Sequence, residues 1–181
     1  CGYCNEFDKT SKPVPLETLR RVVDKLHELG TITLELTGGE PLLNPHTVEV
    51  LRYARERGIP RRRMISNGFL LTREIIEQLN DIGLYQLSIS VDGVEANDTT
   101  EKVLNQLRKR LPLLEQHAKF RVQLGAVLGS TNASDATAVV DYAHAHGFHT
   151  NLNILHDADG QLKLPPAALA GRQVPLLTCL A

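Results

Sequence analysis

Apolar and polar residues alternate with two different periods along the chain, and the two periods predict helices and strands in turn. From Pro15 to Gly30, leucine and valine recur every three or four positions, which is the spacing of an amphipathic helix. Over residues 31–37, apolar and polar residues alternate one by one, which predicts a half-buried strand. Further helices are expected over residues 45–57, 72–82, 100–117 and 134–146, and further strands over residues 63–66, 85–91, 120–128 and 149–155.

This alternation of strands and helices predicts an α/β fold with a parallel sheet and right-handed crossovers. One face of the expected strands is polar, and a flat sheet covered by helices on both sides would bury that face at a cost. A curled sheet instead places the polar face in a lumen, and five expected strands are fewer than the eight of a complete barrel. We therefore predict a partial (β/α) barrel of the TIM type, with a lumen lined by Glu35, Thr37, Ser88, Ser90, Asp92, Arg121, Gln123, Asn151 and Asn153.

Two residues refine the expected helices. Pro112 lies inside the longest expected helix and should kink or divide it, since proline removes a backbone donor. Thr72 stands where its hydroxyl can cap the helix that follows. An internal ion pair between Glu35 and Arg121 is one possible use of the two charges on the lumen face.

Composition restricts the class of protein. The chain has 181 residues, of which 42% are apolar, and this is enough for one buried core. Its net charge of −1 provides no general attraction for nucleic acid, and we interpret the run Arg61–Arg63 as a solvated loop. No apolar stretch reaches the length of a membrane span, so we expect no membrane partner and a cytoplasmic location.

The rhythm of strands and helices ends near Asp157, so we expect a core over residues 1–157 and a tail or linker over residues 158–181. The first residue is Cys1 rather than methionine, and we expect the chain to be a piece that begins inside a metal motif. The third cysteine, Cys179, is too far from the first two for a disulfide framework.

Cys1 and Cys4 form a Cys-x-x-Cys pair, which by itself fits a zinc site, a redox thiol pair or an iron–sulfur cluster. The turn Gly38-Gly39-Glu40 follows an expected strand and offers open backbone and a carboxylate to a cationic ligand. In parallel barrels, the reactive groups gather where strands end. The pair and the turn therefore meet at one rim and favour iron–sulfur chemistry.

Together these residues resemble the core domain of radical S-adenosylmethionine (radical SAM) enzymes over nearly all of residues 1–157. Cys1-Gly2-Tyr3-Cys4 is similar to the end of the family's Cys-x-x-x-Cys-x-x-Cys motif, which implies that one cysteine and the first strand lie upstream. The resemblance implies that Cys1 and Cys4 ligate a [4Fe-4S] cluster and that Tyr3 lies near the adenine of SAM.

The same resemblance assigns the other binding residues. Gly38 and Gly39 would offer backbone to the methionine amino group, and Glu40 would balance its charge. Further contacts to SAM are expected from Ser66, Asn67, Ser90, Gly125 and Asn132, although Asn132 could instead cap a helix.

The activity implied by the resemblance is that of a radical SAM oxidoreductase. An external one-electron reductant would reduce the cluster, SAM would be cleaved, and a 5′-deoxyadenosyl radical would take hydrogen from a substrate. The expected substrate is a peptide or a polar small molecule. Two alternatives remain open at this point: a zinc or redox thiol module on an ordinary barrel, and a binding domain that keeps the fold without catalysis.

Several other residues have more ordinary explanations. Asp92 is expected in a turn rather than in catalysis. His144, His146 and His149 are expected on the surface, whereas His156 ends the last expected strand at the reactive rim. Cys179 alone does not establish an auxiliary cluster.

Overall fold

The computed structural model describes residues 12–98, 100–128 and 133–154, and in these residues five parallel strands form one sheet in the order β1-β2-β3-β4-β5. The strands are β1 (Thr33–Leu36), β2 (Arg61–Ser66), β3 (Gln86–Ser90), β4 (Arg121–Leu128) and β5 (His149–Ile154). The helices are α1 (Leu16–Glu28), the 3₁₀ helix η1 (Pro41–Leu43), α2 (Thr47–Glu56), α3 (Arg73–Asp81), α4 (Leu104–Leu107), α5 (Leu111–His117) and α6 (Ala133–Ala145).

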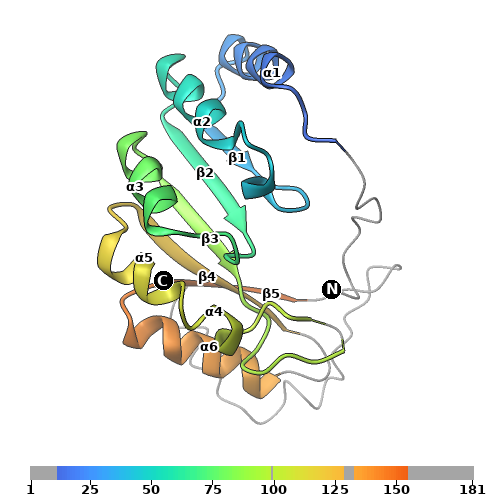
Figure 1. The fold of residues 1–181 in the computed structure, drawn as a ribbon, viewed down its shortest axis with the longest axis vertical. Helices are drawn as coiled ribbons and strands as arrows, with labels where there is room; N and C mark the ends of the chain where they lie inside the picture. The colour runs from blue at the N-terminus through green and yellow to red at the C-terminus, as the bar shows by residue number, and fades with distance from the viewer. Residues whose placement is uncertain (1–11, 99, 129–132, 155–181) are drawn as a thin grey trace.

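The helices lie along one side of a curved sheet (Figure 1). Helix α6 packs on β4 and β5, α3 packs against α5, and α1 packs against α2. Since every neighbouring strand pair is parallel and follows chain order, the helices between successive strands serve as crossover connections, whereas α1 precedes β1. The predicted α/β fold with parallel strands is confirmed.

The segment between β3 and β4 differs from the single long helix that we expected. Two short helices, α4 and α5, replace it, and Pro112 lies in the first turn of α5, where its missing N–H costs nothing. The expected start at Thr100 is wrong, because Val103 forms an isolated bridge with Gly93 and is extended. The expected division at the proline is confirmed, as is the cap at Thr72, whose hydroxyl accepts a hydrogen bond from the Ile75 N–H.

The run of three arginines is part of β2, and its interpretation as a solvated loop was wrong. Arg61 is exposed, and its guanidinium lies 5.5 Å from the centre of the Tyr85 ring. Arg62 is only 8% exposed, and Arg63 points to the opposite face of the sheet. Neighbouring residues of a strand point to opposite faces, so Arg62 is buried on the face of the helices while Arg61 and Arg63 lie on the other face.

Arg62 holds together two turns that each lead from a helix into a strand. Its Nη1 donates to the carbonyl oxygens of Ile59 at 2.6 Å and Pro60 at 3.0 Å. Its Nη2 donates to the carbonyl oxygen of Gly83 at 2.6 Å and lies 3.5 Å from that of Ile82. Burial is the first cause that lowers the pKa of Arg62 from its ordinary value, and repulsion from Arg55 is the second.

The apolar side chains form two buried clusters. The larger cluster fills the space between β2, β3, β4 and their helices, and it includes Met64, Leu87 and Leu124. The smaller cluster joins α1, β1 and α2 and comprises Val23, Leu34, Val50, Ala54 and Ile59. Leu36 packs against both clusters.

Among the described helices, none combines the length and the apolar composition that crossing a membrane requires. His144 and His149 are exposed, and His146 pairs with Glu115 at 2.9 Å on the surface, as expected for these histidines.

Candidate SAM and cluster site

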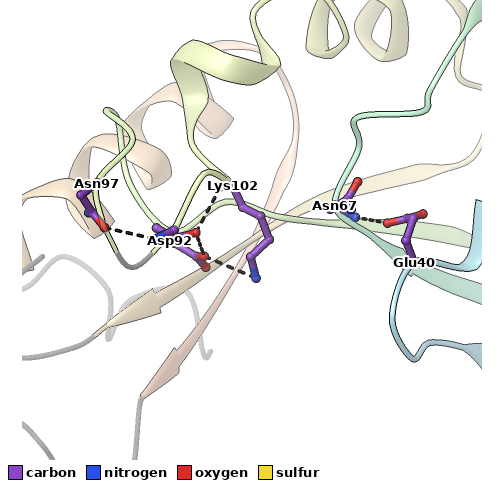
Figure 2. A network of polar contacts seen from close by, with 6 residues as sticks. Glu40, Asn67, Asp92, Asn97 and Lys102 are labelled. Atoms are coloured by element: carbon purple, nitrogen blue, oxygen red, sulfur yellow. Dashed lines mark hydrogen bonds and ion pairs between the residues drawn. The ribbon is translucent and has the colours of Figure 1, made fainter. Parts of the chain in front are cut away.

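The carboxylate of Glu40 joins the turn after β1 to the turn after β2. Its Oε1 accepts hydrogen bonds from the Leu42 N–H at 3.1 Å and from the Ser66 hydroxyl at 2.8 Å. Its Oε2 accepts the Asn67 N–H at 2.7 Å (Figure 2). A carboxylate has about four acceptor positions, so Oε2 keeps one for a further donor. The glutamate predicted to balance an ammonium group is therefore also the link between the two turns.

Ser66 is the second member of this link. It is 2% exposed, and its hydroxyl donates to Glu40 while accepting the Gly68 N–H at 3.0 Å. The side chain of Asn67 turns back on the chain, because its Oδ1 accepts the Phe69 N–H at 3.0 Å. The expected contacts of Ser66 and Asn67 with SAM stay predictions, and for Ser66 a donated bond would require its hydroxyl to leave Glu40.

Gly68 completes the turn in a space that a larger residue does not fit. Its φ is +80°, in the left-handed region, and an added Cβ would lie 3.1 Å from Leu107 Cδ2 and 3.2 Å from Ile89 Cγ2. Both of these side chains belong to the larger core. The turn that carries Asn67 is therefore fixed by backbone conformation and by packing together.

We expect Gly68→Ala to lower the free energy of unfolding by about 2–3 kcal/mol, the sum of left-handed strain and overpacking. Gly30→Ala is the matched control, because Gly30 has a φ of +72° but an added Cβ would meet nothing within 4 Å in the part of the chain that the structure describes. In Gly30→Ala, the free energy of unfolding should fall by only about 1 kcal/mol. Urea unfolding of both variants checks this, and equal losses would show that packing at Gly68 contributes nothing.

The backbone of the Gly38-Gly39 turn is open. An added Cβ at either glycine would meet no atom of the described residues within 4 Å, and Gly38 has a φ of +114°, which side chains rarely adopt. Glu40 follows at once, with its carboxylate held in place as described above. Exposed amides beside an oriented carboxylate fit the amino and carboxyl groups of an amino-acid ligand such as the methionyl part of SAM.

A second group of polar residues lines a cavity of about 170 Å³ on the face of the sheet that the helices do not cover. Ser90, Gly125 and Asn151 are aligned in register across β3, β4 and β5 and form one layer of its wall. Glu35, Arg63, Ser88, Gln123 and Asn153 also line the cavity. The predicted polar lumen is thus present, and it brings together Ser90 and Gly125 of the expected SAM contacts.

Some polar side chains of the lumen wall form hydrogen bonds with one another. Gln86 Nε2 donates to Ser88 Oγ at 3.0 Å and to Gln123 Oε1, which also accepts from Ser88 Oγ at 3.1 Å. Gln123 Nε2 donates in turn to the carbonyl oxygen of Thr150 at 3.1 Å. These side chains form a fixed wall.

Three residues expected on the lumen face lie elsewhere. Asp92 is 3% exposed and accepts a hydrogen bond from the Thr100 hydroxyl at 2.7 Å, with Lys102 at 3.4 Å (Figure 2). It therefore stabilises the loop after β3, as expected for a turn residue. Arg121 lies at the opposite end of its strand with its guanidinium 5.7 Å from the Tyr85 ring centre, and Thr37 lines a separate hollow beside Glu40.

The charge pair of the lumen also differs from the expected one. Glu35 pairs with Arg63 at 3.3 Å, not with Arg121. Arg63 was missed although the strand expected over residues 63–66 already included it, because the run of arginines was interpreted as a solvated loop. The alternation of that strand places Arg63 on the same face as Ile65, two positions away, and this was the available signal.

Several expected site residues lie outside the described residues, and their roles stay predictions: Cys1, Tyr3, Cys4, Asn132, His156 and Cys179. Within residues 12–98, 100–128 and 133–154, no three His, Cys, Asp or Glu side chains are grouped so that they could hold a metal ion.

Curated relatives share sequence with most of this chain. The AdoMet-dependent heme synthase of Methanosarcina barkeri is 29% identical over 81% of this chain and 44% of its own length. The GTP 3′,8-cyclase 1 of Pseudomonas aeruginosa is 35% identical over 81% of this chain and 47% of its own length. A PqqA peptide cyclase of Bradyrhizobium diazoefficiens is 33% identical over 61% of this chain and 30% of its own length. The chain thus spans less than half the length of these relatives.

Solved structures share the fold. SuiB of Streptococcus suis bound to S-adenosylmethionine matches with a TM-score of 0.64, at 15% identity, over 82% of this chain and 35% of that one. HemN of Escherichia coli, a radical SAM enzyme, matches with a TM-score of 0.55, at 13% identity, over 84% of this chain and 40% of that one. The profile of the Radical SAM superfamily matches residues 1–156, so this chain belongs to the radical SAM superfamily.

Proposed function

We propose that this chain is the core of a radical SAM enzyme that binds a [4Fe-4S] cluster and SAM and starts hydrogen abstraction from a substrate. Residues 1–157 would form this core, with Cys1 and Cys4 as two cluster ligands. When bound, the cluster supplies one electron that cleaves the sulfonium bond of SAM and yields a 5′-deoxyadenosyl radical. An external one-electron reductant would return the cluster to its reduced state.

The observation that carries the proposal is the arrangement around Glu40. The open amides of Gly38 and Gly39 and the remaining acceptor position of Glu40 can receive the amino-acid part of SAM. The carboxylate is held by three donors of its own chain, so it does not have to be reoriented when a ligand binds. Two of these three donors, the Ser66 hydroxyl and the Asn67 N–H, belong to the turn after β2, so the carboxylate also fixes that turn beside the proposed site.

The remaining contacts would hold the nucleoside. Ser90 and Gly125 lie in one layer of the lumen wall, and Gly125 brings no side chain into the cavity. Asn67 lies at the end of β2, beside Glu40. A ligand that reaches from Glu40 into the lumen would therefore meet hydroxyl, amide and backbone groups, which suit a ribose and a base.

The substrate is proposed at the level of its class. The named relatives are a heme synthase, a GTP cyclase and a peptide cyclase, and this range fits a peptide or a polar small molecule. The polar lumen wall supports the same class, because buried amides and hydroxyls favour ligands that return hydrogen bonds.

The test is anaerobic reconstitution of the native protein that carries this chain, followed by assay for 5′-deoxyadenosine. With iron, sulfide, SAM and dithionite present, we expect a brown protein and formation of 5′-deoxyadenosine and methionine. Separate omission of SAM, of dithionite and of iron should each abolish the product. A colourless protein that binds zinc would favour the thiol module, and an assembled cluster without product would favour a binding domain without catalysis.

A further inference from the structure

Glu35 and Arg63 form an ion pair inside the lumen. They are register partners on β1 and β2, Arg63 Nε lies 3.3 Å from Glu35 Oε2, and each side chain is 34% exposed. Both line the same cavity as the polar layer of Ser90, Gly125 and Asn151. Among the described residues that line this cavity, these two are the ones that carry charge.

The two side chains are joined by one ion-pair contact, and most of their hydrogen-bonding groups are not used by it. The contact between Nε and Oε2 is close enough for an ion pair but does not have the direction of a hydrogen bond. Within the described residues, the structure shows no hydrogen bond from the two Nη groups of Arg63 or to Oε1 of Glu35. The planar edge of a guanidinium is the group that binds a carboxylate through two parallel bonds.

The charges and polar groups of the cavity wall determine which kind of ligand would fit. The pair is neutral as a whole, so the cavity has no excess positive charge for a polyphosphate. Asn151 and Asn153, which are not among the proposed SAM contacts, have no side-chain hydrogen-bond partner in the part of the chain that the structure describes, and they remain available for polar groups of the substrate. A ligand that carries a positive and a negative group side by side matches this wall best.

We infer that Glu35 and Arg63 bind the amino-acid head of the substrate: Arg63 receives a carboxylate along its Nη edge, and Glu35 accepts the N–H of the adjacent amine or amide. The substrate would thus be a free α-amino acid or the C-terminal residue of a peptide. This inference rests on the proposed function for its meaning as a substrate site, and it adds the class of substrate.

The amino acid of SAM is a different ligand at a different level of the lumen. Glu35 lies on β1, and Thr37 follows two residues later, just past the end of the strand, which is about 7 Å of extended chain. The Gly38-Gly39-Glu40 turn, where the methionyl part of SAM is proposed to bind, lies beyond Thr37. Mutations can therefore test the proposed site for the methionyl part of SAM and the proposed site for the substrate separately.

The experiment uses the native protein labelled with ¹⁵N-arginine, in which the Nε–H signal of Arg63 is assigned by its loss in Arg63→Lys. Glycine should shift this signal saturably at a concentration about tenfold lower than acetate, because only glycine engages both charges. Glu35→Gln should remove this advantage of glycine over acetate. Arg61→Lys is the matched control on the same strand, and it should leave the titration unchanged.

Further probes distinguish the sources of the ligand. Stronger binding of glycine than of N-acetylglycine would assign a free amino acid, and the reverse would assign the C-terminal residue of a peptide. Inorganic phosphate or acetate that binds as tightly as glycine would overturn the inference, because a general anion site would explain it. No saturable shift with glycine would overturn it as well.

The SAM cleavage assay separates this inference from the proposed function. In the wild type, saturating SAM should leave the glycine titration of the Arg63 Nε–H signal unchanged, because the methionyl part of SAM is proposed to bind elsewhere. Loss of the glycine shift when SAM is added, in a protein that cleaves SAM, would assign the pair to the methionyl part of SAM and overturn the inference, while the proposed function would stand. A wild-type protein that binds glycine but does not cleave SAM would contradict the proposed function alone.

Discussion

Glu40→Gln should lower the rate of SAM cleavage about 100-fold, because an amide cannot accept all the hydrogen bonds that the carboxylate accepts. One of its two polar ends carries an NH₂ group, which would face either the Asn67 N–H or the Leu42 N–H and Ser66 hydroxyl. Hydrogen bonds to a charged group contribute about 1.5–3 kcal/mol each, and about 2.7 kcal/mol in the barrier corresponds to this loss of rate.

The variant also loses the negative charge beside the proposed site of the methionine ammonium group. We therefore expect weaker SAM binding together with slower formation of 5′-deoxyadenosine, measured by SAM titration and by product assay. Glu77→Gln is the matched control: Glu77 pairs with Arg73 on the exposed face of α3, so its loss should change stability by less than about 0.5 kcal/mol. Wild-type SAM binding and cleavage in Glu40→Gln would show that the link between the turns is dispensable.

Arg62→Met should lower the free energy of unfolding by about 4 kcal/mol, the largest loss of stability that we expect for a single residue. The methionine fills much of the buried volume but donates no hydrogen bond to the carbonyl oxygens of Ile59, Pro60 and Gly83. A buried polar group that loses its partner costs about 1–3 kcal/mol, and two turns are affected.

Arg61→Met is the control for this variant, because Arg61 is the preceding residue of β2 and is exposed. It should change the unfolding free energy by less than about 0.5 kcal/mol. Arg62→Lys should lie between the two, since one ammonium group cannot reach both turns. Equal urea midpoints for Arg62→Met and the wild type would contradict the assignment of Arg62 as a structural link.

The sequence was sufficient for the elements whose period was clear. Hydrophobic spacing predicted α1, the cap at Thr72 and the stop at Gly147 marked α3 and α6, and the polar face of the strands predicted the lumen with Ser90, Gln123 and Asn151. Both patterns depend on local geometry, since side chains repeat every 3.6 residues on a helix and every two on a strand. The glycine turn was found for the same reason: its conformation is set by its own residues.

The predictions that were wrong concern residues whose partners are far away in the sequence. Composition alone suggested that Arg61–Arg63 is solvated, yet Arg62 is buried because carbonyl oxygens of two separate turns receive its guanidinium. Likewise, the pairing of Glu35 with Arg63 follows from the register of β1 and β2. No local pattern encodes such register, so the function of these charges could not be predicted.

The division of the apolar residues into two clusters means that the molecule does not have one uniform stability. The corner formed by α1, β1 and α2 has its own small core, but α2 also joins the larger core through Val48 and the buried Leu51. The part that can open as a cooperative unit at a lower free energy than global unfolding is therefore α1 with β1, which meets the larger core through Leu36. Because the Gly38-Gly39-Glu40 turn follows β1, local opening would release the turn from β2 without loss of the sheet's larger core.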